Sequence, residues 1–299
     1  MITPPFLSHG DVVGIVAPAR KISANELKPA IGFLEMNGFR VAIGKNIFAK
    51  DNQFAGTDEQ RAADFQTFLD DPDIRAILCA RGGYGSVRII DRLDFSGFVQ
   101  SPKWICGYSD VTVFHSHLHG MGYATLHCTM PINIKEEDFY SPSNTSLVRG
   151  LTGKSLAYTV PAQPLNRCGV VTAPIVGGNL SIMYSLLASE SDINTDGKIL
   201  FIEDLDEYLY HIDRMMMALK RSGKLAKLAG LLVGGMSEMN DNAIPFGHTA
   251  EEIIAHVTEE YGYPVCFGFP AGHIEDNRTL RLGTEVELSV MEKQSVLKF

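Results

Sequence analysis

The sequence KWICGYSDVT, residues 103–112, joins a short apolar strand to a helix through a tight turn. Residues 104–106 form an apolar run that is typical of a strand buried on both faces. Residues 107–110 predict a turn, and residues 111–118 carry a helical pattern. A strand followed directly by a helix is the repeating unit of a sheet covered by helices. The stretch therefore predicts an α/β fold and places Ser109 at the sharpest point of the turn.

The same alternation continues on both sides of this stretch. Further buried strands are predicted by apolar, β-branched runs at residues 11–18, 74–80 and 198–204. Capping boxes that begin at Ser23 and Thr57 predict the starts of two helices. Near the C-terminus, residues 278–290 alternate in polarity around Gly283 and Thr284, which predicts a hairpin. Strands alternating with helices of this length predict a parallel sheet covered on both faces.

The periodic pattern is lost between residues 131 and 169, where Pro, Ser, Asn and Gly are frequent. This composition favours a connection between two domains. Strands and helices alternate again after it. We therefore expect an N-terminal α/β domain at residues 1–135, a linker at 136–169 and a C-terminal β/α domain at 170–299.

Composition narrows the class of protein. The chain has 299 residues, of which 45% are hydrophobic and 20% charged, as in an ordinary globular enzyme. Its net charge of −9 and the lack of a basic cluster argue against a nucleic-acid partner. No apolar run approaches the ~20 residues of a membrane span, and no basic leader opens the sequence. The five cysteines form no CxxC motif and predict buried free thiols. We expect a cytoplasmic protein without a membrane partner.

Ser109 permits two interpretations. A serine in a Gly-x-Ser-x turn between a strand and a helix exposes its oxygen, and the helix N-terminus stabilises developing negative charge. This arrangement suits a nucleophile. The complete G-x-S-x-G pattern is absent because Val111 stands in place of the second glycine. A helix cap by Ser109 or Asp110 is the more common arrangement, so the turn alone leaves both roles open.

A glycine-rich loop, CARGGYGS at residues 79–86, lies between a predicted strand and a predicted helix. Such a loop can hold a phosphate or present backbone N–H groups to an oxyanion. It contains neither a Walker motif nor G-x-G-x-x-G. We expect the N–H groups of Asp110 and Gly83 to form an oxyanion hole. The alternative is a tight turn that only requires glycine.

Two further candidates follow strands in the second half of the chain. Glu203 comes after four apolar residues, at the carboxyl end of a strand, where open α/β sheets gather their sites. A carboxylate there can orient a histidine, although such acids often belong only to a solvated loop. His273 follows a strand and a Pro-Ala-Gly turn, where a base is well placed to reach another domain.

His115 and His119 raise the question of a metal site. They are four residues apart and share one face of the helix that follows Ser109. The pattern is not HExxH, however, and no third ligand follows at a defined spacing. We predict no metal and interpret both residues as helix-surface or core histidines.

Taken in order, Ser109, Glu203 and His273 lie in motifs that resemble those of the LD-carboxypeptidase family of serine peptidases. This family includes the muramoyl-tetrapeptide carboxypeptidases and the microcin C self-immunity peptidases. The similar motifs are RGGYG (81–85), GYSDVT (107–112), PIVGGNLS (174–181), FIED (201–204) and GH (272–273). Together they cover most of the chain.

The resemblance implies a two-domain fold whose N-terminal domain is similar to class I glutamine amidotransferases. It also implies a catalytic triad, with Ser109 from the first domain and Glu203 and His273 from the second. Neither a metal nor an organic cofactor is implied. In the glycine loop, Arg81 and Tyr84 are the candidates for binding substrate, and Arg81 has the charge to pair with a peptide carboxylate.

The substrate implied by the resemblance is cytoplasmic murein tetrapeptide, which loses its terminal D-alanine during cell-wall recycling. One alternative is a peptidase for a peptidyl-nucleotide antibiotic of the microcin C type. Another is a non-catalytic ligand-binding protein on the same fold. The sequence does not fix the oligomeric state, and a homodimer stays open.

Overall fold

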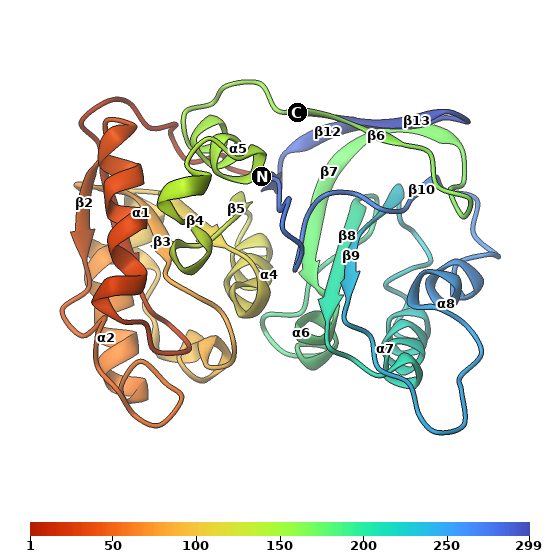
Figure 1. Cartoon of the computed structure of the whole chain (residues 1–299), viewed down its shortest axis with the longest axis horizontal. Helices are drawn as coiled ribbons and strands as arrows, with labels where there is room; N and C mark the ends of the chain where they lie inside the picture. The colour runs from red at the N-terminus through yellow and green to blue at the C-terminus, as the bar shows by residue number, and fades with distance from the viewer.

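A computed structural model describes all residues from Met1 to Phe299. The chain forms two sheets that lie side by side, each covered by helices (Figure 1). The predicted mixed α/β, two-domain class is therefore confirmed. The further likeness of the first domain to class I glutamine amidotransferases stays a prediction.

The first sheet has six strands in the order β11-β5-β4-β3-β1-β2. Its strands are β1 (Val12–Val16), β2 (Arg40–Ile43), β3 (Ile74–Cys79), β4 (Trp104–Gly107), β5 (Thr125–His127) and β11 (Leu280–Leu282). All neighbours are parallel except β11, which is antiparallel to β5. The helices of this half are α1 (Ala24–Met36), α2 (Asp58–Asp70), α3 (Ser96–Gln100), α4 (Thr112–Gly120) and α5 (Pro142–Leu151).

Both faces of the first sheet are buried, as the apolar strands predict. Trp104 packs in the hydrophobic cluster on one face, with Phe33 of α1. Its neighbour Ile105 packs in the cluster on the other face, with Phe65 of α2 and Phe114 of α4. Successive residues of one strand thus enter opposite cores, and helices on both sides enclose the sheet.

The second sheet has seven strands in the order β10-β9-β8-β7-β12-β13-β6. Its strands are β6 (Ala157–Pro161), β7 (Gly169–Asn179), β8 (Ile199–Leu205), β9 (Gly230–Ser237), β10 (Val265–Cys266), β12 (Glu285–Val290) and β13 (Gln294–Lys298). Strands β7 to β10 are parallel, and β12, β13 and β6 extend them in antiparallel order. The helices are α6 (Leu180–Ser185), α7 (Leu209–Arg221) and α8 (Ala250–Val257).

Short 3₁₀ turns complete the fold at Ser86–Arg88, Ile90–Arg92, Ser109–Val111, Pro131–Asn133 and Glu136–Asp138. Both predicted capping boxes are present. Ser23 caps α1 and Thr57 caps α2, and each accepts a hydrogen bond from the backbone N–H three residues later. Local sequence therefore determines where these helices begin.

The expected linker, residues 136–169, is not irregular, because it contains α5 and β6. Ser141 caps α5, and Pro142 occupies its first turn, where the missing N–H removes no helical hydrogen bond. Proline and serine mark the start of a helix here rather than an unstructured connection. The predicted domain boundaries at 135 and 170 stay a prediction.

The predicted hairpin around Gly283 is wrong. Strand β11, before this glycine, pairs with β5 in the first sheet, whereas β12, after it, pairs with β7 in the second. Gly283 has a φ of +87°, and its N–H donates to Ile175 of β7. The alternating pattern arises because consecutive strands are buried in two different sheets, and a pattern of period two does not identify the partner strand.

The cysteines and the helices bear on two further expectations. All five cysteines are free, and Cys79, Cys106, Cys128 and Cys266 are buried, whereas Cys168 is exposed. None of the helices combines the length and the apolar character needed to cross a bilayer.

Candidate active site

Ser109 occupies a strained turn between β4 and α4. Its φ is +64°, a left-handed conformation that is uncommon for residues other than glycine. Gly107, at the end of β4, has a φ of +147°, and a Cβ atom there would lie 2.8 Å from the side chain of Val111. Neither the 3₁₀ turn nor α4 has a side-chain cap. The structure therefore does not support the helix-cap interpretation of Ser109.

The side chain of Ser109 contacts a histidine from the other half of the chain. Ser109 Oγ lies 3.1 Å from Nε2 of His273, 164 residues later in the sequence. Nδ1 of His273 lies 2.6 Å from Oε2 of Glu203, and the backbone N–H of His273 donates to the same oxygen. The three predicted residues thus form a continuous chain of contacts across the two halves.

Glu203 holds His273 through a fully buried carboxylate in β8. The loop that carries His273 approaches this carboxylate closely at Gly272, whose φ is +109°. A Cβ atom on Gly272 would lie 2.6 Å from Oε2 of Glu203. Glycine at this position therefore lets the histidine loop close over the acid.

Opposing effects act on the pKa of His273. Burial lowers it, but the hydrogen bond to Glu203 and the negative charges of Glu203 and Asp204 raise it, so that the net pKa lies above its usual 6.5. With Nδ1–H donated to Glu203, the lone pair of Nε2 faces Ser109. This arrangement can accept a proton from the serine hydroxyl.

Aromatic rings limit how far the imidazole can move. The edge of the Tyr108 ring packs against His273, with centroids 4.9 Å apart. The other side of Tyr108 stacks on His127, and its hydroxyl donates to Oδ1 of Asn133. Sequence patterns did not single out Tyr108, although it precedes the serine directly.

The glycine loop lies against Ser109, as its predicted role requires. The closest contact comes from Gly82, where a Cβ atom would lie 2.8 Å from Ser109 Oγ and 3.4 Å from the backbone N of Asp110. Gly83 lines the same cavity as Ser109, has a φ of +108° and packs beneath the side chain of Arg20. Asp110 follows the serine directly and Gly83 lines the same cavity, and their role as oxyanion donors stays a prediction.

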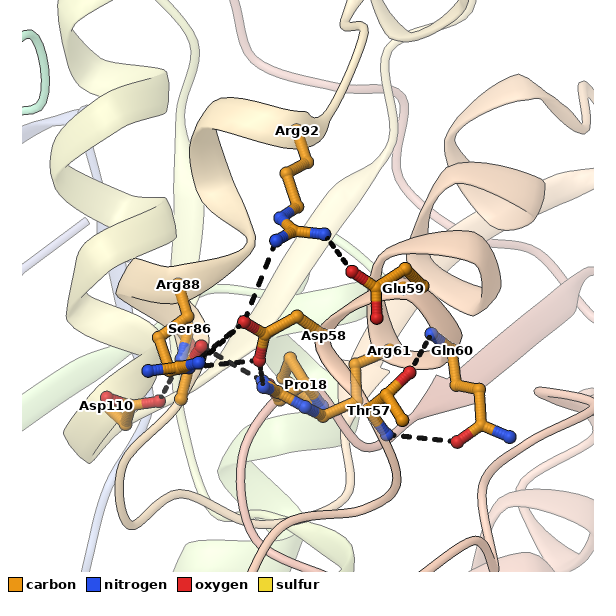
Figure 2. Close-up of polar contacts among 11 residues, drawn as sticks. Pro18, Thr57, Asp58, Glu59, Gln60, Arg61, Ser86, Arg88, Arg92 and Asp110 are labelled. Atoms are coloured by element: carbon orange, nitrogen blue, oxygen red, sulfur yellow. Dashed lines mark hydrogen bonds and ion pairs between the residues drawn. The ribbon is translucent and has the colours of Figure 1, made fainter. Parts of the chain in front are cut away.

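Two charged residues, Arg61 and Asp110, hydrogen-bond to the backbone of this loop and its surroundings (Figure 2). The buried guanidinium of Arg61 donates to the backbone carbonyls of Pro18 and Gly85, and it pairs with Asp58. At the next residue after Gly85, the N–H of Ser86 donates to the buried Asp110 carboxylate at 2.8 Å. The Asp110 carboxylate therefore binds the loop backbone and does not cap the helix.

Two cavities meet at His273. The cavity that contains Ser109 has a volume of about 530 Å³, and the adjoining one a volume of about 500 Å³. Both are lined by Tyr108, Ile132, Asn133, Leu205 and His273. An elongated substrate can therefore extend to both sides of the histidine.

The two predicted substrate-binding residues differ in position. Arg81 lines the Ser109 cavity and donates to the carbonyl of Lys21 at 3.3 Å. Tyr84 lines neither of these cavities and packs instead near Phe54. Arg20, which the sequence analysis missed, also lines the Ser109 cavity. Its position just after a buried strand was the available signal.

His115 and His119 are core residues. His115 is fully buried and its Nε2 hydrogen-bonds to the carbonyl of Gly107, while Nε2 of His119 contacts Oγ1 of Thr125. Burial lowers the pKa of His115 to about 4 and that of His119 to about 3. The structure contains no group of three His, Cys, Asp or Glu side chains with the arrangement of a metal site.

Comparisons with known proteins identify the family of the chain. The family model described as the LD-carboxypeptidase N-terminal domain matches residues 13–128, and the LD-carboxypeptidase C-terminal domain matches residues 172–288. The chain is 35% identical to the probable murein peptide carboxypeptidase of Bacillus subtilis, over 99% of this chain and 94% of that protein. It is 27% identical to the microcin C7 self-immunity protein MccF of Escherichia coli, over 96% and 93% of the two chains.

A solved structure is similar as well. The crystal structure of muramoyltetrapeptide carboxypeptidase from Oxalobacter formigenes superimposes with a TM-score of 0.88 and 26% identity. The similarity covers 96% of this chain and 98% of that one. It therefore includes both sheets.

Proposed function

Because the chain belongs to the LD-carboxypeptidase family, we propose that it is a serine carboxypeptidase that releases terminal D-alanine from murein tetrapeptide in the cytoplasm. The observation that carries the proposal is the run of contacts from Ser109 Oγ to His273 and from His273 to the buried Glu203. The murein substrate is supported by the names of the relatives from Bacillus subtilis and Oxalobacter formigenes.

In the proposed reaction, Ser109 Oγ attacks the scissile carbonyl carbon while Nε2 of His273 takes the hydroxyl proton. Glu203 keeps the imidazole in the required tautomer and stabilises its charged form. The tetrahedral oxyanion lies between the N–H groups of Asp110 and Gly83. When the C–N bond breaks, His273 gives its proton to the leaving amine of D-alanine.

The second half of the reaction regenerates the enzyme. The acyl group that remains on Ser109 is attacked by water, from which His273 again takes a proton. The bond between the acyl carbon and Ser109 Oγ then breaks, the shortened peptide leaves with a free carboxyl group, and His273 returns its proton to Oγ. The chemistry requires only water and the side chains and backbone N–H groups of this protein, so we propose that no metal or organic cofactor takes part. Turnover should accordingly be unchanged after extensive dialysis against EDTA.

Specificity for a terminal D-residue follows from how the substrate is held. With the terminal carboxylate and the scissile carbonyl both fixed, inversion of the last α-carbon exchanges its methyl group with its hydrogen. The methyl group then meets the wall, or the carbonyl leaves the oxyanion donors, and a misplacement of ~1 Å can lower the rate about 10²-fold. Arg81, in the Ser109 cavity, has the charge to bind the terminal carboxylate.

Three peptides of equal length test this proposal. They end in free D-Ala, free L-Ala and amidated D-Ala, and mass spectrometry follows the released residue. We expect cleavage of the first alone, because amidation leaves the cation that binds the carboxylate unpaired. Comparable cleavage of all three would identify a general peptidase and exclude the tetrapeptide function.

A second candidate is a self-immunity peptidase that cleaves a peptidyl-nucleotide antibiotic. The identity of 27% to the microcin C7 self-immunity protein favours it. Competition between murein tetrapeptide and a peptidyl-nucleotide substrate in one assay separates the two enzymes. A non-catalytic binding protein would cleave neither, and its Ser109 would not react with a fluorophosphonate.

A further inference from the structure

The motif PIVGGNLS, at the end of β7, contacts the beginning of α4. The backbone N–H of Asn179, the last residue of β7, donates to Oγ1 of Thr112 at 3.0 Å. Thr112 is the first residue of α4 and follows Ser109 by three positions. Both residues are buried. The second sheet is thus hydrogen-bonded directly to the element that carries the serine.

Two glycines make this approach possible. Gly178 has a φ of +148°, and a Cβ atom on it would lie 2.5 Å from Oγ1 of Thr112. Gly177 has a φ of +130°, and a Cβ atom on it would overlap the carbonyl oxygen of Phe201 in β8. The end of β7 therefore fits between α4 and β8 without room for a side chain.

The side chain of Asn179 continues the contact toward β8. Its Nδ2 donates to Oδ1 of Asp204 at 3.0 Å, and its Oδ1 accepts from the backbone N–H of Ile182 as the N-cap of α6. Asp204 accepts two further hydrogen bonds, from the backbone N–H groups of Ser181 and Leu205. Its carboxylate is fully engaged within the protein, although it lies in the wall of the Ser109 cavity.

These contacts close a ring through the active site. Asp204 follows Glu203 in β8, and Glu203 hydrogen-bonds to His273, which contacts Ser109. Ser109 leads through one helical turn to Thr112, and Thr112 returns through Asn179 to Asp204. The distance between Ser109 and His273 depends on how the two sheets are placed relative to each other. The hydrogen bonds of this ring join the two sheets close to the Ser109–His273 contact.

We propose that Thr112, Asn179 and Asp204 form an interdomain clasp that sets the position of Ser109 relative to His273 and Glu203. The three are positioning residues, because the side-chain hydrogen bonds of the clasp join protein groups to one another. This inference rests on the proposed function. A displacement of ~1 Å at the reacting atoms can lower a rate about 10²-fold. Loss of the clasp should therefore lower kcat.

The test compares Thr112→Val with Thr112→Ser. Valine keeps the shape but removes the acceptor for the Asn179 N–H, whereas serine keeps the hydroxyl. The first readout is the rate at which a fluorophosphonate labels Ser109. In this reaction the P–F bond breaks, a P–O bond to Ser109 forms, fluoride leaves and His273 takes the proton. The second readout is kcat and KM for release of D-Ala from murein tetrapeptide.

We expect Thr112→Val to lower both the labelling rate and kcat about 10²-fold with little change in KM, and Thr112→Ser to keep most of both. Asn179→Asp is the second variant. It retains the oxygen that caps α6 but faces Asp204 with a second carboxylate, and it should lose kcat in the same way. Thermal unfolding establishes that each variant is folded at the assay temperature.

Ser116→Ala is the matched control. Ser116 lies one turn further along α4 and donates to the carbonyl of Ser191 in the second half of the chain, away from the triad. We expect its kcat to stay near that of the unmodified protein. An equal loss in Ser116→Ala would mean that general contact between the sheets, rather than the clasp, supports catalysis.

Other outcomes would also overturn the clasp. These are normal labelling and turnover in folded Thr112→Val and Asn179→Asp, or a loss in Thr112→Ser as large as that in Thr112→Val. Failure of the proposed function looks different, because the unmodified protein would then release no D-Ala, whether or not its Ser109 reacts with the fluorophosphonate.

Discussion

At Ser109 the requirements of chemistry and of backbone stability conflict. A left-handed conformation costs an L-residue about 1–2 kcal/mol, and such strain persists where the surrounding structure determines the conformation. Here Gly107, Gly82 and the contact with His273 surround the residue. The turn raises the hydroxyl toward the imidazole, which an unstrained helix start would not do.

Replacing Ser109 by glycine or by alanine should separate these two requirements. Both variants should be inactive, since each lacks the hydroxyl. Ser109→Gly should be more stable than Ser109→Ala by up to about 1 kcal/mol, because relief of the left-handed strain exceeds the entropy that glycine adds to the unfolded chain. Urea unfolding measures the difference. Greater stability in the alanine variant would show that the positive φ is not strained.

The three triad residues should behave as one unit. Ser109→Ala, Glu203→Ala and His273→Ala should each lower kcat by roughly 10³-fold or more, and double variants should be little worse than single ones. Circular dichroism checks that the fold is retained. Near-normal turnover in the His273 variant would remove the histidine from the mechanism.

The pH dependence of activity tests the influence of Glu203 on His273. The imidazole must be neutral to accept a proton, so kcat/KM should fall as the pH drops through the His273 pKa, which lies above 6.5. Glu203→Gln removes a negative charge that raises this pKa. Its residual activity should therefore have a midpoint at lower pH.

Glu207→Gln is the control for this experiment. Glu207 lies close by in sequence but pairs with His211 rather than with His273. Its removal should leave the midpoint of the pH profile in place. An unchanged midpoint in Glu203→Gln as well would mean that the carboxylate does not govern the titration of His273.

At the scale of elements, the glycine loop and the serine turn depend on each other. Gly82 needs to be glycine because Ser109 fills the space of a side chain. The loop is held there by hydrogen bonds from Arg61 to the Gly85 carbonyl and from the Ser86 N–H to Asp110. A loop with such buried supports keeps its N–H groups oriented before substrate arrives, which is what stabilisation of an oxyanion requires.

Gly82→Ala tests this dependence. The added methyl group meets Ser109 Cβ and Oγ at 2.8 Å, so the serine must shift, and we expect kcat to fall about 10²-fold in a folded protein. Gly120→Ala, at the end of α4, is the control, because the nearest atom to its methyl group is 3.9 Å away. Steady-state kinetics measures kcat for both variants. Equal kcat values would mean that the loop shifts to accommodate the methyl group without displacing Ser109.

Element-scale features were predictable where the signal is local. The capping boxes at Ser23 and Thr57 identified helix starts because the cap and its partner are three residues apart. The partner of β11 was not predictable, since β5 lies more than 150 residues earlier in the chain. Likewise, Tyr84 shares a loop with Gly83, yet only the folded loop shows that it turns away from the cavity.

At the scale of the molecule, the site exists only where the two halves meet. Strand ends and the family resemblance predicted that Ser109, Glu203 and His273 act together, but the distances between their atoms were not predictable. Ser109 and His273 are 164 residues apart, and the 3.1 Å between them depends on how α4 packs against β7. Thr112 and Asn179 had no sequence signal beyond the resemblance of their motifs.

The position of β11 also bears on how the protein is made. A ribosome releases residues 1–135 long before Leu280–Leu282, and β5 has no partner on its outer edge until that segment emerges. Unpaired edges are templates for wrong pairing. The N-terminal sheet is thus completed near the end of synthesis, and a shortened chain that stops before residue 280 should aggregate, as light scattering would reveal. During synthesis, the first half of the chain is therefore protected from wrong pairing only after the last strands have left the ribosome.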